Sequence, residues 1–269
     1  MAKVRLDVLM VERGLVESRS QAQRLIMAGQ VRAAGQLVTK PATSVQIDVT
    51  LEVDQGPPYV SRGGEKLAGA LAHFPIQVDG LICADVGAST GGFTDCLLQN
   101  GAQRVYAIDV GYGILHWKLR QDPRIVLMER TNARYVERLP EPVQLVTIDA
   151  SFISLKILLP VVIAWFPSSG GQVIALIKPQ FEAGRREAAR RNGVIRDTHI
   201  HARVLSETLE YAQQAGFGVN GLVRSPLIGP KGNVEFLAWL LYPPATGTAA
   251  HGPDLAELIA GVLQPPDDG

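Results

Sequence analysis

The chain has 269 residues, of which 46% are apolar, so it can bury a sizeable core in one large domain or two smaller ones. Its 26 basic and 26 acidic residues balance, and net charge therefore gives no indication of a nucleic-acid partner. The most apolar run, 157–166, is interrupted by Pro160 and falls far short of the roughly 20 residues of a membrane span, and we expect neither a signal peptide nor a membrane-inserted protein.

Two short helices are expected near the N-terminus. Residues 5–13 carry apolar side chains at helical spacing, and Gly14 ends that helix. Ser18, followed three residues later by Gln21, is typical of a helix start, and the second helix should run to residue 28. The apolar stripes that these helices would bury are Leu6, Leu9 and Met10 in the first and Ala22, Leu25 and Ile26 in the second.

Short strands should follow these helices. Residues 31–33 and 37–39 flank an Ala-Gly turn, which predicts a hairpin, and the alternation over 45–53 predicts a further strand. A Gly-Pro-Pro segment then has the composition of a linker. We therefore expect a small α+β domain over residues 1–56 and a linker at 57–60.

Three stretches within residues 5–40 form one continuous pattern. They read Arg-Leu-Asp-Val-Leu-Met-Val-Glu-Arg-Gly-Leu, Ser-Arg-Ser-Gln-Ala-Gln-Arg-Leu-Ile and Ala-Gly-Gln-Val. The pattern resembles the small RNA-binding fold of ribosomal protein S-four and of many pseudouridine synthases. Scattered arginines are usually a solvated face, but the resemblance implies contacts to RNA phosphates. The residues expected to make those contacts are Arg5, Arg19, Arg24, Arg32 and Lys40.

From residue 80 onward, strand-like and helix-like segments alternate. This alternation is typical of an α/β domain, and we expect a Rossmann-like fold over residues 61–243 with a mostly parallel seven-stranded sheet and helices on both faces. Residues 244–269 should form a Pro/Gly-rich tail with a helix at 254–263. The expected strands are 81–85, 105–109, 125–128, 145–149, 172–177, a segment around Val219 and 234–242, and the expected helices include 93–99 and 202–216.

A glycine-rich turn follows the first strand of this domain. It lacks the close glycine pair of the dinucleotide fingerprint, which argues against NAD. Asp109 ends the next strand, where a carboxylate can accept hydrogen bonds from both ribose hydroxyls. An acidic residue at the start of the turn suits an amino group and a sulfonium, so we expect S-adenosylmethionine rather than an ordinary tight turn. The expected cofactor-binding residues are Asp85, Gly87, Ala88, Ser89, Thr90, Gly91, Gly92, Phe93 and Asp109.

Four charged residues could carry chemistry. Asp149 and Lys178 end the fourth and fifth strands, where ligands bind in open α/β sheets, while Lys66 precedes the first strand and Glu235 precedes the last. Each alone is usually a surface ion pair. Together they resemble the Lys-Asp-Lys-Glu tetrad of the FtsJ-like ribose 2′-O-methyltransferases.

A longer series of motifs extends this resemblance to almost the whole chain. In order they are Ser-Arg-Gly-Gly-Glu-Lys, Gly-Ala-Ser-Thr-Gly-Gly-Phe, Asp-Val-Gly-Tyr-Gly, Glu-Arg-Thr-Asn-Ala-Arg, Ser-Phe-Ile-Ser-Leu, Lys-Pro-Gln-Phe-Glu and Gly-Asn-Val-Glu. The series is similar to the TlyA family of rRNA 2′-O-methyltransferases, long labelled haemolysins. The resemblance implies methylation of a cytidine ribose in 16S or 23S rRNA, ribosomal subunits as partners, a cytoplasmic location and a cofactor contact from Asn132.

The residue types suit this chemistry. A ribose hydroxyl must lose its proton as the methyl group moves, and a lysine accepts a proton only in its neutral form, which burial or a second ammonium favours. We assign Lys178 as the base, Lys66 as the second cation, and Asp149 and Glu235 as the groups that orient the lysines. Further RNA contacts are expected from Arg62 and from the basic stretch that contains Arg185 and Arg186.

Other readings are weaker. Cys83 and Cys96 lie in apolar segments, so we expect them to be buried and not to act as nucleophiles. His199 and His201 face apart on a helix, and we interpret them as a solvated helix start rather than a metal pair. No metal site and no stable protein partner are expected. The alternatives from other classes are a membrane-active haemolysin and a non-catalytic RNA-binding protein.

Overall fold

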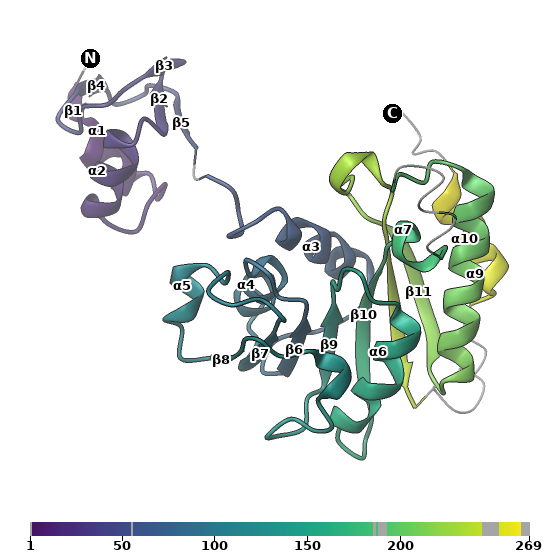
Figure 1. Cartoon of the computed structure of the whole chain (residues 1–269). Coiled ribbons are helices and arrows are strands. Elements are labelled where there is room, and N and C mark those ends of the chain that lie inside the picture. The colour runs from purple at the N-terminus through teal and green to yellow at the C-terminus, as the bar shows by residue number, and fades with distance from the viewer. Residues whose placement is uncertain (1, 55, 185–186, 188–192, 244–252, 265–269) are drawn as a thin grey trace. The chain divides into compact units, whose positions relative to one another are not determined.

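The chain folds into two compact units, Met1–Pro58 and Tyr59–Gly269 (Figure 1). In this computed structural model the described residues are 2–54, 56–184, 187, 193–243 and 253–264. Each unit has its own hydrophobic core, and the two are described separately below.

Two helices and two small sheets make up the first unit. Helices α1 (Leu6–Glu12) and α2 (Arg19–Met27) pack together, and the Ser18 hydroxyl caps α2 by accepting the N–H of Gln21 at 3.3 Å, as predicted. The six predicted stripe residues all belong to its core, with Leu25 only partly buried. One sheet pairs β1 (Lys3–Arg5) with β4 (Ser44–Gln46), and the other has the order β3 (Gln36–Leu37), β2 (Val31–Ala33), β5 (Leu51–Val53).

The single strand predicted over 45–53 is wrong, because the segment contributes to both sheets. β4 ends at Gln46 and a turn follows, closed by the N–H of Val49 donating to the Gln46 carbonyl at 3.1 Å. The Arg13 guanidinium then donates to the carbonyls of Ile47 and Val49, which supplies the hydrogen bonds that a continuous strand would have found in a sheet. Alternation of side chains alone cannot reveal such a break.

A buried carboxylate holds the first unit together. Asp7 is fully buried in α1 and accepts hydrogen bonds from Arg5 at 2.9 Å, Arg19 at 2.9 Å and Gln23 at 2.9 Å. The Arg5 guanidinium, with help from Gln23 and Arg19, holds the pKa of Asp7 well below its usual range. Two arginines that were predicted to contact RNA therefore also support the fold, although about half of each side chain stays exposed.

We expect Asp7→Asn to lower the free energy of unfolding of the first unit by about 1–3 kcal/mol, because three side-chain donors lose the buried charged acceptor that they share. The folded state lowers the pKa of Asp7, so its stabilising contribution is present at neutral pH and is lost as the pH falls below about 4. Amide hydrogen exchange of α1 and α2 in the full chain measures this. Equal protection of wild type and Asp7→Asn at pH 7 would contradict the assignment, and their difference should shrink at pH 3.

A seven-stranded sheet forms the centre of the second unit, which confirms the predicted fold class. Its order is β11-β12-β10-β9-β6-β7-β8; β12 pairs antiparallel with β10 and β11, and the other neighbouring strands pair in parallel. The strands are β6 (Ile82–Val86), β7 (Arg104–Ile108), β8 (Ile125–Met128), β9 (Leu145–Ile148), β10 (Gly171–Ile177), β11 (Gly218–Arg224) and β12 (Phe236–Tyr242).

Helices lie on both faces of this sheet (Figure 1). The inner strands read as near-continuous apolar runs because both of their faces are covered; all of β9, for example, is buried. Separate hydrophobic clusters pack on the two faces. The helices are α3 (Gly63–His73), α4 (Gly92–Gln99), α5 (Trp117–Arg120), α6 (Leu155–Val162), α7 (Pro179–Glu182), α9 (Thr198–Gln214) and α10 (Leu255–Leu263), with the short turns η1 (Ala133–Tyr135), η2 (Ile163–Trp165) and η3 (Pro230–Gly232).

The interpretation of both histidines as a solvated helix start is wrong for His201. Helix α9 begins at Thr198, earlier than predicted, because Asp197 caps it by accepting the N–H of His199. His201 thereby lies a turn inside the helix, is buried against Phe236, and its Nε2 lies 2.9 Å from the carbonyl oxygen of Ile195. Both cysteines are free and buried, as predicted.

Candidate active site

The glycine-rich loop between β6 and α4 packs against the end of β9. Gly87 has φ 83° and Gly91 has φ 99°, a backbone region that favours glycine. A Cβ on Gly87 would lie 2.7 Å from the carbonyl oxygen of Asp149 and 3.0 Å from Cα of Ala150. Only a glycine therefore allows the loop to approach the segment that carries Asp149.

Asp85, at the foot of this loop, is buried completely. Its carboxylate accepts the hydroxyl hydrogens of Thr94 at 2.7 Å and Thr147 at 3.0 Å. Burial raises the pKa of Asp85 to about 6, against the opposing effect of the two threonine hydrogen bonds. Asp85 thus links β6 to Thr94 of α4 and Thr147 of β9, and it lines neither of the cavities described below. Its predicted contact with a cofactor stays a prediction.

Asp109 follows β7 at the same edge of the sheet. Its two carboxylate oxygens accept the backbone N–H of Ser89 at 2.8 Å and of Gly111 at 2.7 Å. Each oxygen keeps a further lone pair for a ligand. The nearby Asn132 side chain accepts the backbone N–H of Arg134 at 3.2 Å. Asp109 thus joins the glycine loop to the next strand and can still bind hydroxyl groups.

Lys178 lies at the end of β10 in a cage of oxygens. Its Nζ is 2.5 Å from a carboxylate oxygen of Asp149, 3.1 Å from the hydroxyl oxygen of Ser151 and 3.3 Å from the carbonyl oxygen of Ala150. Only 7% of the residue is exposed. These three acceptors match the three N–H groups that a lysine ammonium can donate.

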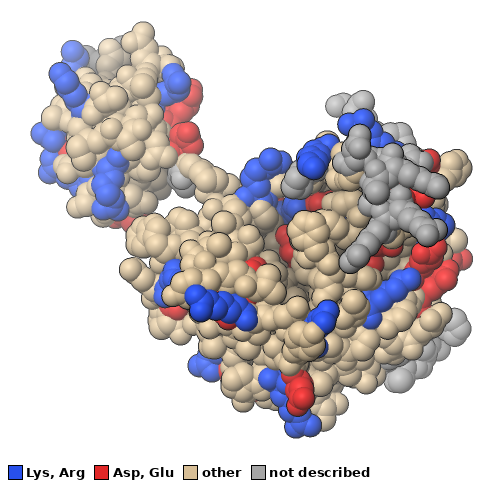
Figure 2. All heavy atoms as spheres, viewed as in Figure 1, with Lys and Arg blue, Asp and Glu red and all other residues tan. Residues whose placement is uncertain are grey.

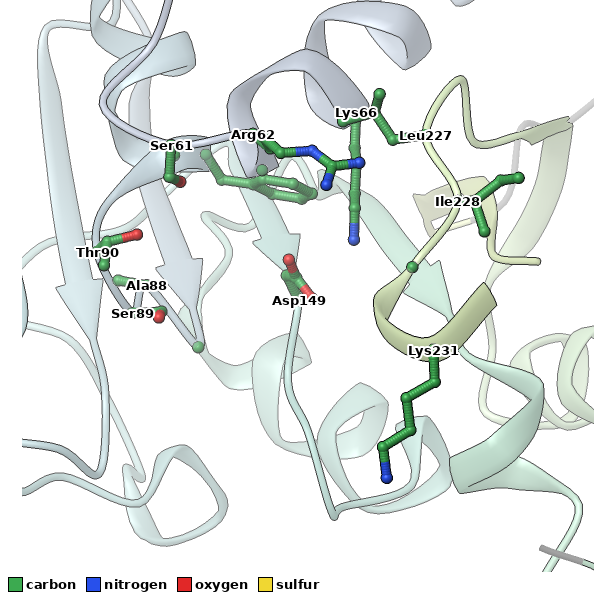
Figure 3. A pocket seen from close by; sticks show the side chains of 15 residues that line it. Ser61, Arg62, Lys66, Ala88, Ser89, Thr90, Asp149, Leu227, Ile228 and Lys231 are labelled. Carbon is green, nitrogen blue, oxygen red and sulfur yellow. The ribbon is translucent and has the colours of Figure 1, made fainter. Parts of the chain in front are cut away.

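Lys66, on α3, forms the second ion pair of the site. Its Nζ lies 2.6 Å from a carboxylate oxygen of Glu235, which precedes β12 and is almost completely buried. In Figure 3, Lys66 extends from the start of α3 toward the level of Asp149, while the Arg62 side chain extends above Asp149 toward Lys66. Each lysine therefore has its own carboxylate. The predicted influence of Lys66 on the protonation of Lys178 stays a prediction.

Two cavities meet at this cluster. One, of about 530 Å³, is lined by the glycine loop, the start of α3 and the turn before β12; the other, of about 770 Å³, is lined by the ends of β9 and β10 and by the same turn. The residues that line both are Lys66, Gly87, Ser89, Asp149 and Lys231. A ligand on the glycine loop and a second ligand near Lys178 could thus contact each other.

Most of the described site residues that were predicted in the second unit line these cavities. The four charged residues do so, as do Arg62 and six residues of the loop, whereas Asp85, Gly91, Asp109 and Asn132 do not. The lining residues that the sequence reasoning did not assign include Ser61, Ser151, Phe152, Gln180, Phe181 and Lys231. Several of these lie within the quoted motifs, but a motif does not tell which of its side chains face a cavity.

Basic side chains are spread over the first unit (Figure 2). Arg24, Arg32 and Lys40 are exposed, and none of them forms an ion pair with a described residue. They are therefore better placed to contact phosphates than Arg5 and Arg19, which are held by Asp7. Arg185 and Arg186 lie outside the described residues. Among the described residues, no group of His, Cys, Asp and Glu could hold a metal ion.

Family comparisons agree with this geometry. The model of the FtsJ-like methyltransferase family matches residues 59–242, and that of the S4 domain matches residues 4–51. The chain belongs to the FtsJ-like methyltransferase family. As a member, it is an S-adenosylmethionine-dependent methyltransferase with an N-terminal S4 RNA-binding domain.

Two relatives and one solved structure match most of the chain. "16S/23S rRNA (cytidine-2'-O)-methyltransferase TlyA" of Mycobacterium tuberculosis is 47% identical over 88% of this chain and 90% of its own length. "Hemolysin A" of Brachyspira hyodysenteriae is 42% identical over 87% of this chain and 98% of its own. The structure "Putative hemolysin from Streptococcus thermophilus" is 44% identical, with a TM-score of 0.69, over 97% of this chain and 96% of that one. The resemblance to the TlyA family is thereby confirmed.

Proposed function

We propose that this methyltransferase acts on the 2′-oxygen of a cytidine ribose in ribosomal RNA. The observation that carries the proposal is the pair of close lysine–carboxylate contacts beside the glycine loop, Lys178 with Asp149 at 2.5 Å and Lys66 with Glu235 at 2.6 Å. The name of the TlyA relative supplies the substrate class. Ribosomal subunits are then its partners, and the cytoplasm is its place of action.

Lys178 serves as the base in this proposal. The ribose hydroxyl gives its proton to Nζ as the oxygen becomes a nucleophile, and the ammonium that forms is held by the three oxygens around it. A base accepts a proton only in its neutral form, so Lys178 has to enter this step as the amine.

The other residues position the reactants. Bound S-adenosylmethionine supplies the electrophilic methyl group. The Asp149 carboxylate orients Lys178, and the Asp149 backbone packs closely against Gly87. The base and the glycine loop therefore keep a fixed separation. The pair of Lys66 and Glu235 closes the other wall of the cavity. Such fixed placement is a large part of what an enzyme contributes to a transfer between two bound groups.

The described residues fit this cofactor. The cavity of about 530 Å³ beside the glycine loop is in the usual range for a ligand of this size. Glycine φ angles let the backbone come close, and the Asp109 carboxylate has lone pairs left for ribose hydroxyls. Asp109 would hold the ribose, while the loop would hold the rest of the nucleoside.

We expect Asp109→Ala to weaken S-adenosylmethionine binding by about 1–3 kcal/mol, the scale for a lost charged acceptor. The loop would also lose its tie to β7, because the N–H of Ser89 would have no acceptor there. Asp109→Asn keeps one acceptor oxygen and should lose less. Calorimetry with the full chain measures the change, and an unaltered affinity in Asp109→Ala would place the ribose elsewhere.

RNA binding by the S4 domain should depend on Arg24 more than on Arg19. Arg24→Ala removes an exposed charge without touching Asp7, so it should weaken RNA binding and lower the slope of log affinity against log salt by about one. Arg19→Ala also disturbs the fold and is a poor probe. Filter binding across several salt concentrations tests this. A slope equal to that of wild type would exclude a phosphate contact at Arg24.

The haemolysin reading rests on the names of relatives. Among the described residues, no helix is long and apolar enough to cross a membrane. Leakage of vesicles by the protein in the absence of methyl donor would favour that reading. The non-catalytic reading has to explain why two lysine–carboxylate pairs line a cavity beside a glycine loop.

The proposal is tested with tritiated S-adenosylmethionine and purified 30S and 50S ribosomal subunits that lack the modification. We expect label in the RNA of at least one subunit and none in its proteins. Two results would contradict an rRNA substrate. One is label in ribosomal protein, and the other is no label in either subunit although the enzyme preparation binds S-adenosylmethionine.

A further inference from the structure

Lys231 lines both cavities but takes part in neither of their two lysine–carboxylate ion pairs. Among the described residues, the charged side chains that line the two cavities are four cations, Arg62, Lys66, Lys178 and Lys231, and two carboxylates, Asp149 and Glu235. Both carboxylates are already paired, with Lys178 and Lys66. Neither of the other two cations forms an ion pair with any residue that the structure describes. The described part of the walls therefore carries excess positive charge, which favours an anionic ligand.

The turn that presents Lys231 is firmly built. Lys231 has φ 63° and ψ 8°, a left-handed conformation that is unfavourable for a residue with a Cβ. The N–H of Gly229 donates to the Asn233 carbonyl at 2.8 Å, and the N–H of Gly232 donates to the Gly229 carbonyl at 3.1 Å. The backbone strain at Lys231 is thus maintained by the turn at the edge of both cavities.

Asn233 fixes the base of this turn to another part of the domain. Its side-chain oxygen accepts the N–H of Ile195 at 3.0 Å, and its side-chain nitrogen donates to the carbonyl of Gly193 at 2.9 Å. Asn233 itself is buried. The position of the Lys231 backbone is therefore determined from two sides, while its side chain stays exposed.

The side chain extends along the wall opposite the glycine loop. In Figure 3, Lys231 and the loop residues Ser89 and Thr90 lie on either side of Asp149. A ligand whose reacting atom lies near Lys178 and Asp149 would therefore pass Lys231 as it leaves the cavity. In an RNA chain, the anionic groups on either side of a ribose are its phosphates, and a lysine ammonium binds phosphate as a compact point charge.

We propose that Lys231 binds the phosphate next to the target ribose and so sets the depth at which the 2′-oxygen enters the cavity. This inference rests on the proposed RNA substrate. The competing ligand is the carboxylate of the cofactor, because Lys231 also lines the cavity beside the glycine loop. The two ligands predict different effects of the same substitution.

The test compares Lys231→Ala and Lys231→Arg with wild type in the full chain. Arg203→Ala is the control, since it also removes one exposed positive charge, but from α9 and away from both cavities. Equilibrium binding of the rRNA substrate is measured at several salt concentrations with S-adenosylhomocysteine present. Cofactor affinity is measured by calorimetry, and KM and kcat by methyl transfer.

Lys231→Ala should weaken RNA binding about tenfold, lower the salt slope by about one, and raise KM for RNA more than it lowers kcat. Lys231→Arg should restore most of the binding, and cofactor affinity should not change. A salt slope equal to that of Arg203→Ala would overturn the proposal, and so would a loss of cofactor affinity with unchanged RNA binding. If wild type transfers no methyl group to rRNA, the proposed function fails, while the salt slope still decides the phosphate contact.

Discussion

Lys178→Ala should reduce methyl transfer to RNA by a factor of about 10² or more, the usual contribution of a positioned base. The fold and cofactor binding should survive, because Lys178 lies at the end of β10 and does not support the glycine loop. Lys178→Arg should fail to a similar degree, since a guanidinium keeps its proton at workable pH and cannot accept another. Single-turnover rates with saturating cofactor and RNA measure the effect.

The control for this experiment is Lys118→Ala, which removes an exposed lysine of α5 that lines neither cavity. Its turnover should equal that of wild type. A Lys178→Arg enzyme with nearly normal turnover would eliminate the proposed base. Catalysis would then depend on placement of the reactants alone, or on Asp149 as the proton acceptor.

Gly87→Ala should be nearly as damaging, for a different reason. Its new Cβ would lie 2.7 Å from the carbonyl oxygen of Asp149, so the loop or the end of β9 must move. Misplacement by about 1 Å can cost about 10²-fold in rate, and we expect a loss of at least this size. Cofactor affinity should fall as well. Calorimetry and methyl transfer in the same preparation separate the two effects.

Gly80→Ala is the matched control, because Gly80 has φ 74° and no atom within 4 Å of a new Cβ. Both substitutions place an alanine in a left-handed backbone conformation, which lowers stability in each variant. Only in Gly87→Ala does the new Cβ also clash with the carbonyl oxygen of Asp149. If the two variants lose activity equally, the close approach of the loop to β9 has no role in catalysis.

The sequence predicted the central sheet well because its strands are short, apolar and separated by helices. Strands buried on both faces need continuous apolar runs, and this requirement is visible in the chain, as in β9, which was predicted at 145–149 and is observed at Leu145–Ile148. The order of motifs likewise placed Asp149 and Lys178 at one edge of the sheet. Local chemistry determined these features, so local patterns could predict them.

Contacts between distant residues could not be predicted in this way. Nothing in the spacing of residues tells that Arg5 and Arg19 share a buried partner in Asp7, or that Lys66 pairs with Glu235 across 169 positions. The early start of α9 depended on its cap, and it carried His201 from the expected surface into the core. Side-chain pairing and burial follow from tertiary packing, which a single sequence does not display.

The position of the transferred methyl group tests the central claim most directly. RNA labelled by the wild-type enzyme is hydrolysed with alkali, which cleaves after every ribose that has a free 2′-hydroxyl. We predict that the label is recovered in an alkali-resistant dinucleotide whose 5′ residue is cytidine, and that Lys178→Ala yields almost none. Label recovered in mononucleotides would mean that a base is methylated, and it would contradict the assignment of Lys178, Asp149, Lys66 and Glu235 to ribose 2′-O chemistry.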